Sequence, residues 1–308
     1  NRGIAVRDQD MSLEKTFTER DAKLDPPPNM TPEQRKVWDA DYEPRNARFR
    51  AANLQGKDLV RWRYQRYMHD YTGTVRAVDE SVGRLLDYLE QGGIADNTIV
   101  VYSSDQGFFL GEHGWFDKRW IFEESARTPL LVRWPGVSRA GSVSKDIVSN
   151  LDFAQTFLDA AGVAAPVDMQ GRSLRPVLAG QRPADWRTSF YYQYFEWPRP
   201  HHVRPHYGVI TDRYKLVRYY GNGETKTDLF DSEKDPLEVK SFFGQPGYES
   251  VQADLEARLA KLRVDLKVPE VEDEYASGAK KRAGANQVPA KNAGKGKGKG
   301  KVPAPAAK

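Results

Sequence analysis

The chain has 308 residues, of which 39% are hydrophobic and 11% aromatic, so it can bury a substantial core and is not a natively disordered protein. It contains no cysteine, which excludes disulfides, thiolate metal sites and a cysteine nucleophile within the chain. The formal net charge of +4 does not indicate a nucleic-acid-binding domain, because much of the excess lies in the last segment of the chain.

The sequence contains no apolar run long enough to span a membrane as a helix, and no signal peptide is visible. The chain begins with Asn1 rather than with Met. We therefore expect it to be a fragment whose true start is missing.

Residues 1–56 are predicted to form an irregular segment that wraps a larger body, because they combine a proline triplet with few apolar runs. A short helix is expected at "TPEQ". Thr31 can serve as the N-cap there, and Pro32 suits the first helical position.

Residues 57–91 have the clearest helical periodicity. Apolar side chains recur at spacings of three and four, which predicts one continuous stripe. Gly92 or Gly93 would end this helix. The mixture of bases and aromatics in "RWRYQRY" resembles a nucleic-acid surface, but on an amphipathic helix the aromatic rings would face the core, so this alternative is not favoured.

Strands are predicted at 98–103 and 129–136, followed by a capped amphipathic helix at 149–163. This alternation indicates an α/β fold over residues 57–186.

From about residue 187, aromatic and β-branched runs separated by turns predict an antiparallel sheet of about four short strands. An amphipathic helix closes this unit, so residues 187–268 are predicted to form a small α+β subdomain. Residues 269–308 include a low-complexity Lys/Gly/Pro/Ala-rich tail, which we predict to be disordered.

Polar chemistry is concentrated directly after the 98–103 strand. Asp105 and Gln106 offer neighbouring carboxylate and amide oxygens, which suit calcium or magnesium better than zinc. Lys118 follows closely and could contact an anion held by such a cation. On spacing alone, a turn that hydrogen-bonds its own backbone and an ordinary surface lysine are the favoured interpretations.

The string "SSDQGFFLGEHGWFDKRWIFEESARTPLLVRWPG" resembles the C-terminal catalytic motif of type I, formylglycine-dependent sulfatases in the alkaline phosphatase superfamily. The preceding helix and "YGVITDRYKLVRYY" further along resemble the same family, so the resemblance covers roughly residues 55–268. It implies the C-terminal part of an alkaline-phosphatase-like sandwich with a small C-terminal α+β subdomain. Within the family, these stretches of sequence are most similar to bacterial N-acetylglucosamine-6-sulfatases and other glycosaminoglycan sulfatases.

The resemblance also implies roles for individual residues. Asp105 and Gln106 would be two ligands of a Ca²⁺ ion, and Lys118 would be a catalytic residue that contacts the sulfate ester. His113 would line the substrate pocket or orient the Lys118 loop, although a histidine satisfied by the backbone is about equally expected. An amide at Gln106 argues against two-zinc phosphatases, which need histidine at or near this position.

The family's nucleophile motif, Cys/Ser-x-Pro/Ala-x-Arg, is absent from this chain. The resemblance therefore implies that formylglycine and further metal ligands belong to a missing N-terminal half of the same protein. We expect the isolated chain to be inactive and to bind calcium weakly. From the family, the parent protein is expected to be periplasmic or secreted.

The loop "EWPRPHHVRPHYGV" at 196–209 concentrates His202, Arg204 and His206, together with His201. These basic, planar groups could contact a sulfated carbohydrate substrate. A proline-rich loop with incidental charge remains an alternative, and a zinc site is a weaker one.

The sequence thus favours a sulfatase that acts on a sulfated carbohydrate. The alternatives left open are a phosphomonoesterase or phosphonate hydrolase of the same superfamily, a non-catalytic sulfated-glycan binding module, and a truncated fragment with no independent role. No nucleic-acid partner and no membrane span are expected.

Overall fold

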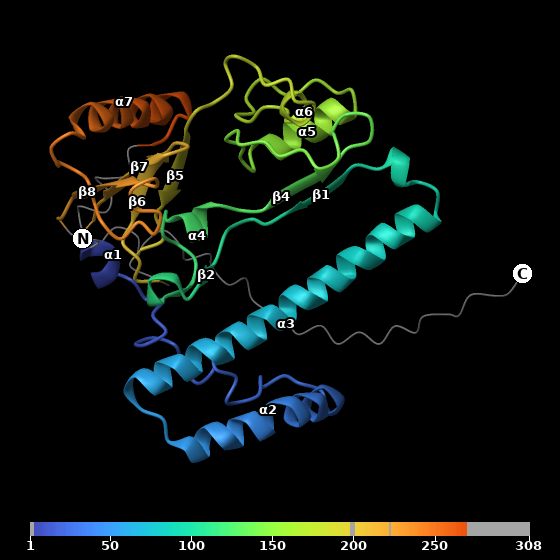
Figure 1. Cartoon of the computed structure of the whole chain (residues 1–308), viewed down its shortest axis with the longest axis vertical. Helices are drawn as coiled ribbons and strands as arrows, with labels where there is room; N and C mark the ends of the chain where they lie inside the picture. Colours follow the sequence, from blue (N-terminus) through green and yellow to red (C-terminus); the bar gives the residue numbers. More distant parts are fainter. Residues whose placement is uncertain (1–2, 198–200, 222, 270–308) are drawn as a thin grey trace, which may run out of the picture.

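The computed structural model describes residues 3–197, 201–221 and 223–269. The tail that was predicted to be disordered lies almost entirely outside these residues. Helices and small antiparallel sheets alternate along the described chain, which confirms the predicted α/β class (Figure 1).

A short helix α1 (Gly3–Arg7) is followed by α2 (Pro32–Ala52). The predicted cap is confirmed: Thr31 Oγ1 accepts from the Gln34 amide at 3.3 Å, and Gln34 Oε1 accepts from the Thr31 amide at 3.0 Å. The expectation of a short helix in an irregular segment is wrong, because α2 has 21 residues. The helix continues through Pro44, a residue that normally disfavours helix interiors.

The long predicted helix is confirmed as α3 (Gly56–Gln91), and Gly93 follows it with a φ of +65°. Helices α2 and α3 lie alongside each other as a hairpin (Figure 1). Arg66 Nη2 donates to Asn46 Oδ1 at 2.9 Å, and the Phe49 and Trp62 rings stack. The second half of α3 leaves apolar side chains exposed, including Val75, Val78, Leu85 and Tyr88.

After the 3₁₀ turn η1 (Ala95–Asn97), strand β1 (Val100–Ser103) pairs antiparallel with β4 (Leu130–Arg133) in a two-stranded ribbon. The chain between them forms a small hairpin and two short helical segments. They are β2 (Phe109–Leu110), η2 (Glu112–Gly114), β3 (Phe116–Asp117) and α4 (Glu123–Ala126). Helices α5 (Asp152–Ala160) and α6 (Arg175–Leu178) follow β4.

The predicted four-stranded sheet is confirmed. It consists of β5 (Phe190–Tyr194), β6 (His206–Ile210), β7 (Tyr214–Tyr219) and β8 (Lys226–Asp231), antiparallel and in sequence order. Helix α7 (Glu249–Asp265) covers one face, where its Leu255 and Leu259 are buried against the sheet (Figure 1).

The other face of the sheet packs against the segment just after β3. Trp120, Ile121 and Phe122 are buried there with apolar residues of the strands, such as Val217 and Phe230. This layer fixes the position of the polar stretch that immediately precedes Trp120. None of the helices in the described part of the chain is long and apolar enough to cross a membrane.

One ion pair should give the sheet a defined acid response. Arg213 contacts both oxygens of the buried Asp231 at 2.9 Å, and this hydrogen-bonded guanidinium, with a contribution from the Tyr248 hydroxyl, lowers the pKa of Asp231 to about 2. A lowered folded-state pKa stabilises the protein above the unfolded value near 3.8. This stability is lost as the pH falls from about 4 to about 2.

We therefore predict that Arg213→Met lowers the free energy of unfolding at pH 7, because it leaves the buried Asp231 carboxylate without its guanidinium partner. Urea denaturation at pH 7 and pH 2.5 measures the effect, and the deficit should shrink at the lower pH. A deficit that is constant with pH would contradict the role of this pair.

Candidate active site

The turn predicted to bind a cation follows β1 directly. The Ser104 hydroxyl donates to the Gln106 carbonyl at 2.8 Å and lies 3.4 Å from Asp105 Oδ1. The Asp105 side chain is exposed, and Gln106 is half-buried. The turn therefore uses its own hydroxyl to set its shape and leaves carboxylate and amide oxygens available to a ligand.

Gly107 packs this turn closely against α4. Its amide donates to the Ser125 carbonyl at 2.9 Å. A Cβ at this position would lie 2.1 Å from the Glu124 carbonyl oxygen and 2.8 Å from that of Arg127. Only glycine allows the backbone to approach so closely, so the spacing of the motif is a packing requirement.

The segment after Gly107 contains unusual backbone conformations. His113, Asp117 and Arg119 have φ values of +60°, +74° and +128°, a region that non-glycine residues rarely adopt. Such strain persists where surrounding contacts determine the conformation, and it concentrates at functional sites. Two of these residues flank Lys118.

His113 lies inside the protein. Its side chain is 4% exposed, packs against the rings of Phe109, Trp115 and Phe122, and places Nε2 3.4 Å from Glu124 Oε2. Burial acts to raise the pKa of Glu124, but the hydrogen bond with His113, a backbone hydrogen bond and the nearby charges of His113 and Lys215 together outweigh it, so that this pKa is lowered overall. The geometry suits a role in orienting the loop rather than in lining a pocket.

Lys118 is partly exposed at the end of β3. Its Nζ lies 3.7 Å from Asp117 Oδ1 and 5.7 Å from the centre of the Phe108 ring. Both contacts are loose, so the ammonium group can bind an anion without breaking a tight ion pair.

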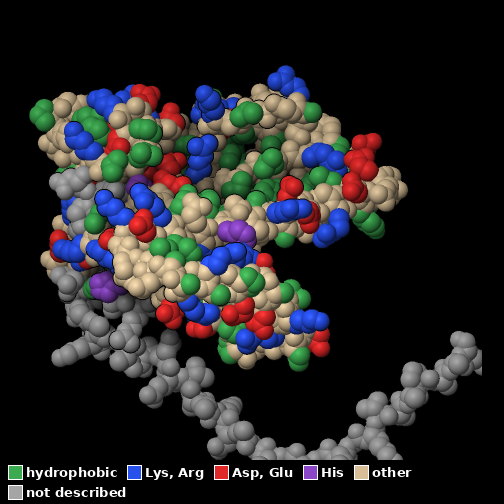
Figure 2. Space-filling view, turned by 60° about the horizontal axis from the view of Figure 1, so that its bottom comes forward, with side chains coloured by type: hydrophobic (Ala, Val, Ile, Leu, Met, Phe, Trp, Pro, Cys, Tyr) green, Lys and Arg blue, Asp and Glu red, His purple; other side chains and the backbone are tan. Residues whose placement is uncertain are grey.

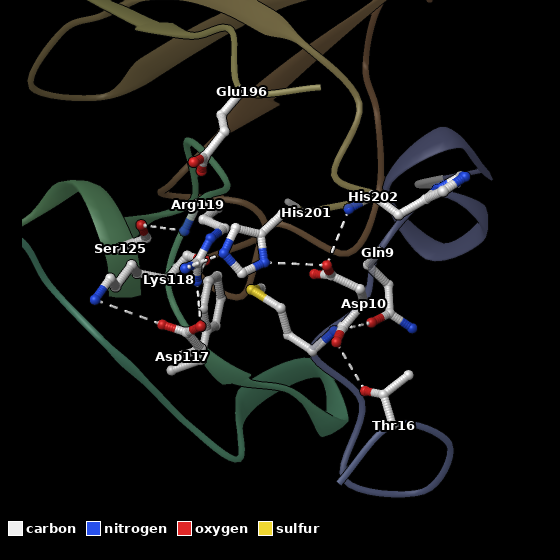
Figure 3. A network of polar contacts seen from close by, with 12 residues as sticks. Gln9, Asp10, Thr16, Asp117, Lys118, Arg119, Ser125, Glu196, His201 and His202 are labelled. Atoms are coloured by element: carbon white, nitrogen blue, oxygen red, sulfur yellow. Dashed lines mark hydrogen bonds and ion pairs between the residues drawn. The ribbon is translucent and has the colours of Figure 1, made fainter. Parts of the chain in front are cut away.

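A polar network begins at Lys118 and Asp117 and joins three parts of the chain (Figure 3). Arg119 pairs with Asp117 and places Nη2 2.7 Å from His201 Nε2. His201 Nδ1 in turn lies 3.2 Å from Asp10 Oδ2, which also accepts from the His202 amide at 2.9 Å. His201 belongs to the basic loop identified from the sequence, whereas Asp10, Asp117 and Arg119 had no predicted site role, although the residues beside Lys118 could have been included from their position.

Ser125 brings the two parts of the motif together. Its carbonyl accepts from the Gly107 amide, and its hydroxyl accepts from the Arg119 amide at 3.2 Å. The Asp105–Gln106 turn and the Lys118–Arg119 stretch are therefore attached to the same residue of α4.

Arg204 and His206 do not lie on the loop surface. Arg204 is buried and pairs with Asp8 at 2.6 Å. His206 is the first residue of β6 and is fully buried, so burial lowers its pKa to about 4. Neither side chain reaches the surface in this conformation, because Arg204 is bound to Asp8 and to the Gly221 carbonyl, and the pairing of β6 turns His206 inward. His202 is exposed.

The neutral His206 ring acts instead as a link within the core. Its Nδ1 lies 2.8 Å from the Arg204 carbonyl, so this nitrogen carries the proton, and Nε2 accepts from the Ile121 amide at 3.2 Å. Trp120 and Tyr192 stack on the ring. His206 therefore connects the motif to the loop that carries His201 and His202.

The described residues contain no group of three His, Cys, Asp or Glu side chains placed to hold a metal ion. Asp105 and Gln106 together offer hard oxygen donors of the kind that Ca²⁺ prefers, and neither is engaged in a close ion pair. Their chemistry fits a hard cation, but Ca²⁺ takes six to eight ligands, so these two residues would form one side of a site.

The turn with the exposed Asp105 and the stretch that carries Lys118 are thus both attached to α4 through Ser125. Two family models match the chain: that of the sulfatases over residues 18–163, and that of the C-terminal region of N-sulphoglucosamine sulphohydrolase over residues 111–265. The chain belongs to the sulfatase family.

Among its relatives, the chain is 48% identical over 272 residues to an N-acetylglucosamine-6-O-sulfatase of Bacteroides thetaiotaomicron, a match that covers 82% of this chain and 49% of the relative. It is 30% identical to a multifunctional alkaline phosphatase superfamily protein of Trinickia caryophylli, over 70% of this chain and 43% of that protein. The chain spans about half the length of the curated relatives it matches.

The fold is likewise similar to that of a solved structure described as a complex with its substrate, D-glucosamine-2-N,6-O-disulfate. The TM-score is 0.83 and the identity 46%, covering 89% of this chain and 58% of that one. This similarity confirms the expected sulfatase-like, alkaline-phosphatase-superfamily fold.

Gly107→Ala should damage the site by pushing the turn away from α4. We predict a loss of about 1–3 kcal/mol in the free energy of unfolding, because the added methyl group meets backbone that cannot move aside. Gly83→Ala is a matched control, since a Cβ at Gly83 in α3 has open space around it and should leave stability unchanged or slightly raised. Urea denaturation measures the free energy of unfolding of both variants. Equal stability of the two would contradict the close packing of Gly107 against α4.

Proposed function

We propose that this chain is the C-terminal part of a sulfatase that hydrolyses a sulfate ester on a sulfated carbohydrate. The observation that supports it most directly is the attachment of the Asp105–Gln106 turn and the Lys118–Arg119 stretch to the same residue, Ser125. Two similar proteins, an N-acetylglucosamine-6-O-sulfatase and a protein in complex with a glucosamine disulfate, support a sulfated glucosamine as the substrate.

In this proposal, Asp105 and Gln106 hold one side of a Ca²⁺ ion, which neutralises negative charge on the bound sulfate. Formylglycine, the family's nucleophile, comes from polypeptide outside this sequence. Lys118 binds a sulfate oxygen and stabilises charge that develops as the ester bond breaks. His113 and Glu124 hold the loop that presents Lys118.

Sugar recognition is proposed for the polar network around Lys118. Arg119, Asp117 and His201 present two cationic or polar donors and one carboxylate acceptor, which can bind hydroxyl or sulfate groups of a sugar. His202 is exposed and is also proposed to contact the sugar. Arg204 and His206 are buried and are not part of the proposed substrate site.

The rest of the sulfatase domain is proposed to cover the exposed apolar surface of this chain. Figure 2 shows hydrophobic side chains in a hollow on one face of the molecule. Exposed apolar residues lie along α3, on the β1–β4 ribbon at Tyr102 and Leu131, and on α5 at Phe157. The ribbon has only two strands, and such a pair is marginal without further strands or a covering layer.

We keep residues 57–186 and 187–268 as the proposed division between catalytic region and C-terminal subdomain. A periplasmic or secreted location is proposed from the membership of the family.

The first test concerns calcium. With only part of the ligand set, the isolated chain should bind Ca²⁺ with a dissociation constant of about 10⁻³ M or weaker, and Asp105→Ala should abolish the binding. Calorimetric titration measures it, with Asp96→Ala, an exposed aspartate before β1, as the control. Tight, stoichiometric binding by the isolated chain would contradict the assignment of the remaining ligands to another part of the protein.

The second test concerns catalysis in the complete enzyme that contains this chain. Lys118→Ala should lower kcat on a 6-O-sulfated glucosamine by about 10²-fold or more, because it removes a charge that stabilises the transition state. Lys261→Ala, an exposed lysine of α7, should have no effect. A K118A enzyme with unchanged kcat would remove Lys118 from the mechanism.

The same enzyme preparation separates the alternative functions. Activity on aryl phosphate or phosphonate above that on aryl sulfate would favour the phosphomonoesterase or phosphonate hydrolase alternative. Binding of sulfated glycans by the isolated chain that survives chelation of calcium, and is lost in His202→Ala, would favour a non-catalytic binding module.

A further inference from the structure

The four-stranded sheet contacts the segment between β3 and α4 at successive positions along residues 119–123. From β5, the Tyr192 hydroxyl donates to the Arg119 carbonyl at 3.2 Å. From β6, His206 accepts from the Ile121 amide at 3.2 Å. The next contacts come from β7 and from the loop after β8, and both of them involve Glu123.

Glu123, the first residue of α4, is held by a buried ion pair. Lys215 Nζ lies 3.0 Å from Glu123 Oε1 and 2.6 Å from Glu238 Oε1. The other oxygen of Glu238 accepts from the Glu123 amide at 2.8 Å. The side chains of Lys215 and Glu238 are each only 4% exposed.

The backbone of Glu238 supports a dedicated arrangement. Its φ is +50°, in the left-handed region, so the loop adopts an unfavourable conformation that aims the carboxylate at Lys215 and at α4. A buried ion pair contributes little net stability compared with apolar residues, but it requires a specific geometry. This makes a role in positioning a better account of the pair than a role in stability alone.

Contacts then lead from the pair to the proposed site. Glu238 fixes Glu123 at the start of α4, and Ser125, two residues further on, binds the Gly107 amide through its carbonyl and the Arg119 amide through its hydroxyl. We infer that Lys215 and Glu238 are positioning residues, which hold α4 so that the Asp105–Gln106 turn and the Lys118–Arg119 stretch keep one relative geometry. The functional meaning of this geometry rests on the proposed function, whereas the geometry itself does not.

Hydrogen exchange of the 308-residue chain, measured by mass spectrometry, tests this inference without metal or substrate. In Glu238→Ala, amides that depend on α4 should exchange about tenfold faster or more, while the β6–β7 and α7 peptides are unchanged. The amides in question are those of Gly107, Arg119, Ala126 and Arg127.

A second variant separates positioning from general stability. Lys215→Met/Glu238→Gln removes both charges but leaves an amide oxygen that can accept from the Glu123 amide, so protection of the same amides should return to within about threefold of the parent. If Glu238→Ala does not fold, Lys215→Met/Glu238→Met replaces it in the comparison, because it removes both charges together with the acceptor of the Glu123 amide. Unchanged exchange in the single variant, or equally fast exchange in the double variant, would overturn the inference.

Arg213→Met is the matched control. It removes the partner of the buried Asp231 in the same sheet but makes no contact with α4 among the described residues. It should accelerate exchange near β8 and the start of α7 and leave residues 105–127 unchanged. Acceleration of 105–127 equal to that in Glu238→Ala would show that any loss of sheet stability loosens the motif, and would also overturn the inference.

The outcome is independent of the calcium and activity tests. Tight calcium binding by the isolated chain, or binding that Asp105→Ala leaves unchanged, together with the expected exchange pattern would leave the positioning role intact and count against the metal proposal alone. The expected calcium and activity results without the exchange pattern would do the reverse.

Discussion

The backbone contact between Gly107 and Ser125 is the constraint on which the candidate site depends. It brings the turn after β1 against α4, and the close approach of Gly107 to the Glu124 and Arg127 carbonyls leaves no room for a side chain. The Ser125 hydroxyl then binds the Arg119 amide, so one residue aligns two stretches that are separated by a hairpin. Without this contact, Asp105 and Lys118 would lie on independent loops.

The C-terminal sheet gives α4 its own support. One face of the sheet is covered by α7, and the other packs against Trp120, Ile121 and Phe122. The apolar side chains of this segment bury their surface in the sheet, while its backbone groups are bound by polar side chains from β5 and β6. Hydrophobic packing and directed hydrogen bonds therefore both act on residues 119–122, which explains how unfavourable φ values at Asp117 and Arg119 can persist.

The parts of the fold that were predicted correctly are those with a strong local signal. The periodicity of α3, its glycine stop, and the alternating aromatic runs of β5–β8 are properties of short windows of sequence. The length of α2 was not predictable in this way, because Pro44 gives a local signal that tertiary contacts of Asn46 and Arg50 with the Leu24 region override. Likewise, the strands β1 and β4 were expected, but their antiparallel pairing depends on contacts across the whole hairpin between them.

The candidate site shows the same division. The position of Asp105, Gln106 and Lys118 at a strand end followed from the sequence, and their roles remain proposals. The side chain of His206 points inward because β6 begins at this residue, and that of Arg204 is buried because it pairs with Asp8. A cluster of basic residues in the sequence does not show which of them will be buried. Asp10 belongs to the polar network because it contacts His201, a residue that is far from it in the sequence. Residues so distant in sequence meet only because the N-terminal segment returns to the β5–β6 loop.

His206 sets a lower limit on the pH at which its contact with the Ile121 amide persists. It accepts the Ile121 amide through an unprotonated nitrogen, so the contact exists only while the ring is neutral. Burial lowers the pKa of His206 to about 4, so the ring stays neutral through the range in which a histidine at the surface would gain a proton. The contact between His206 and the Ile121 amide is thereby insulated from mild acidification, so this part of the support behind Lys118 persists through that range.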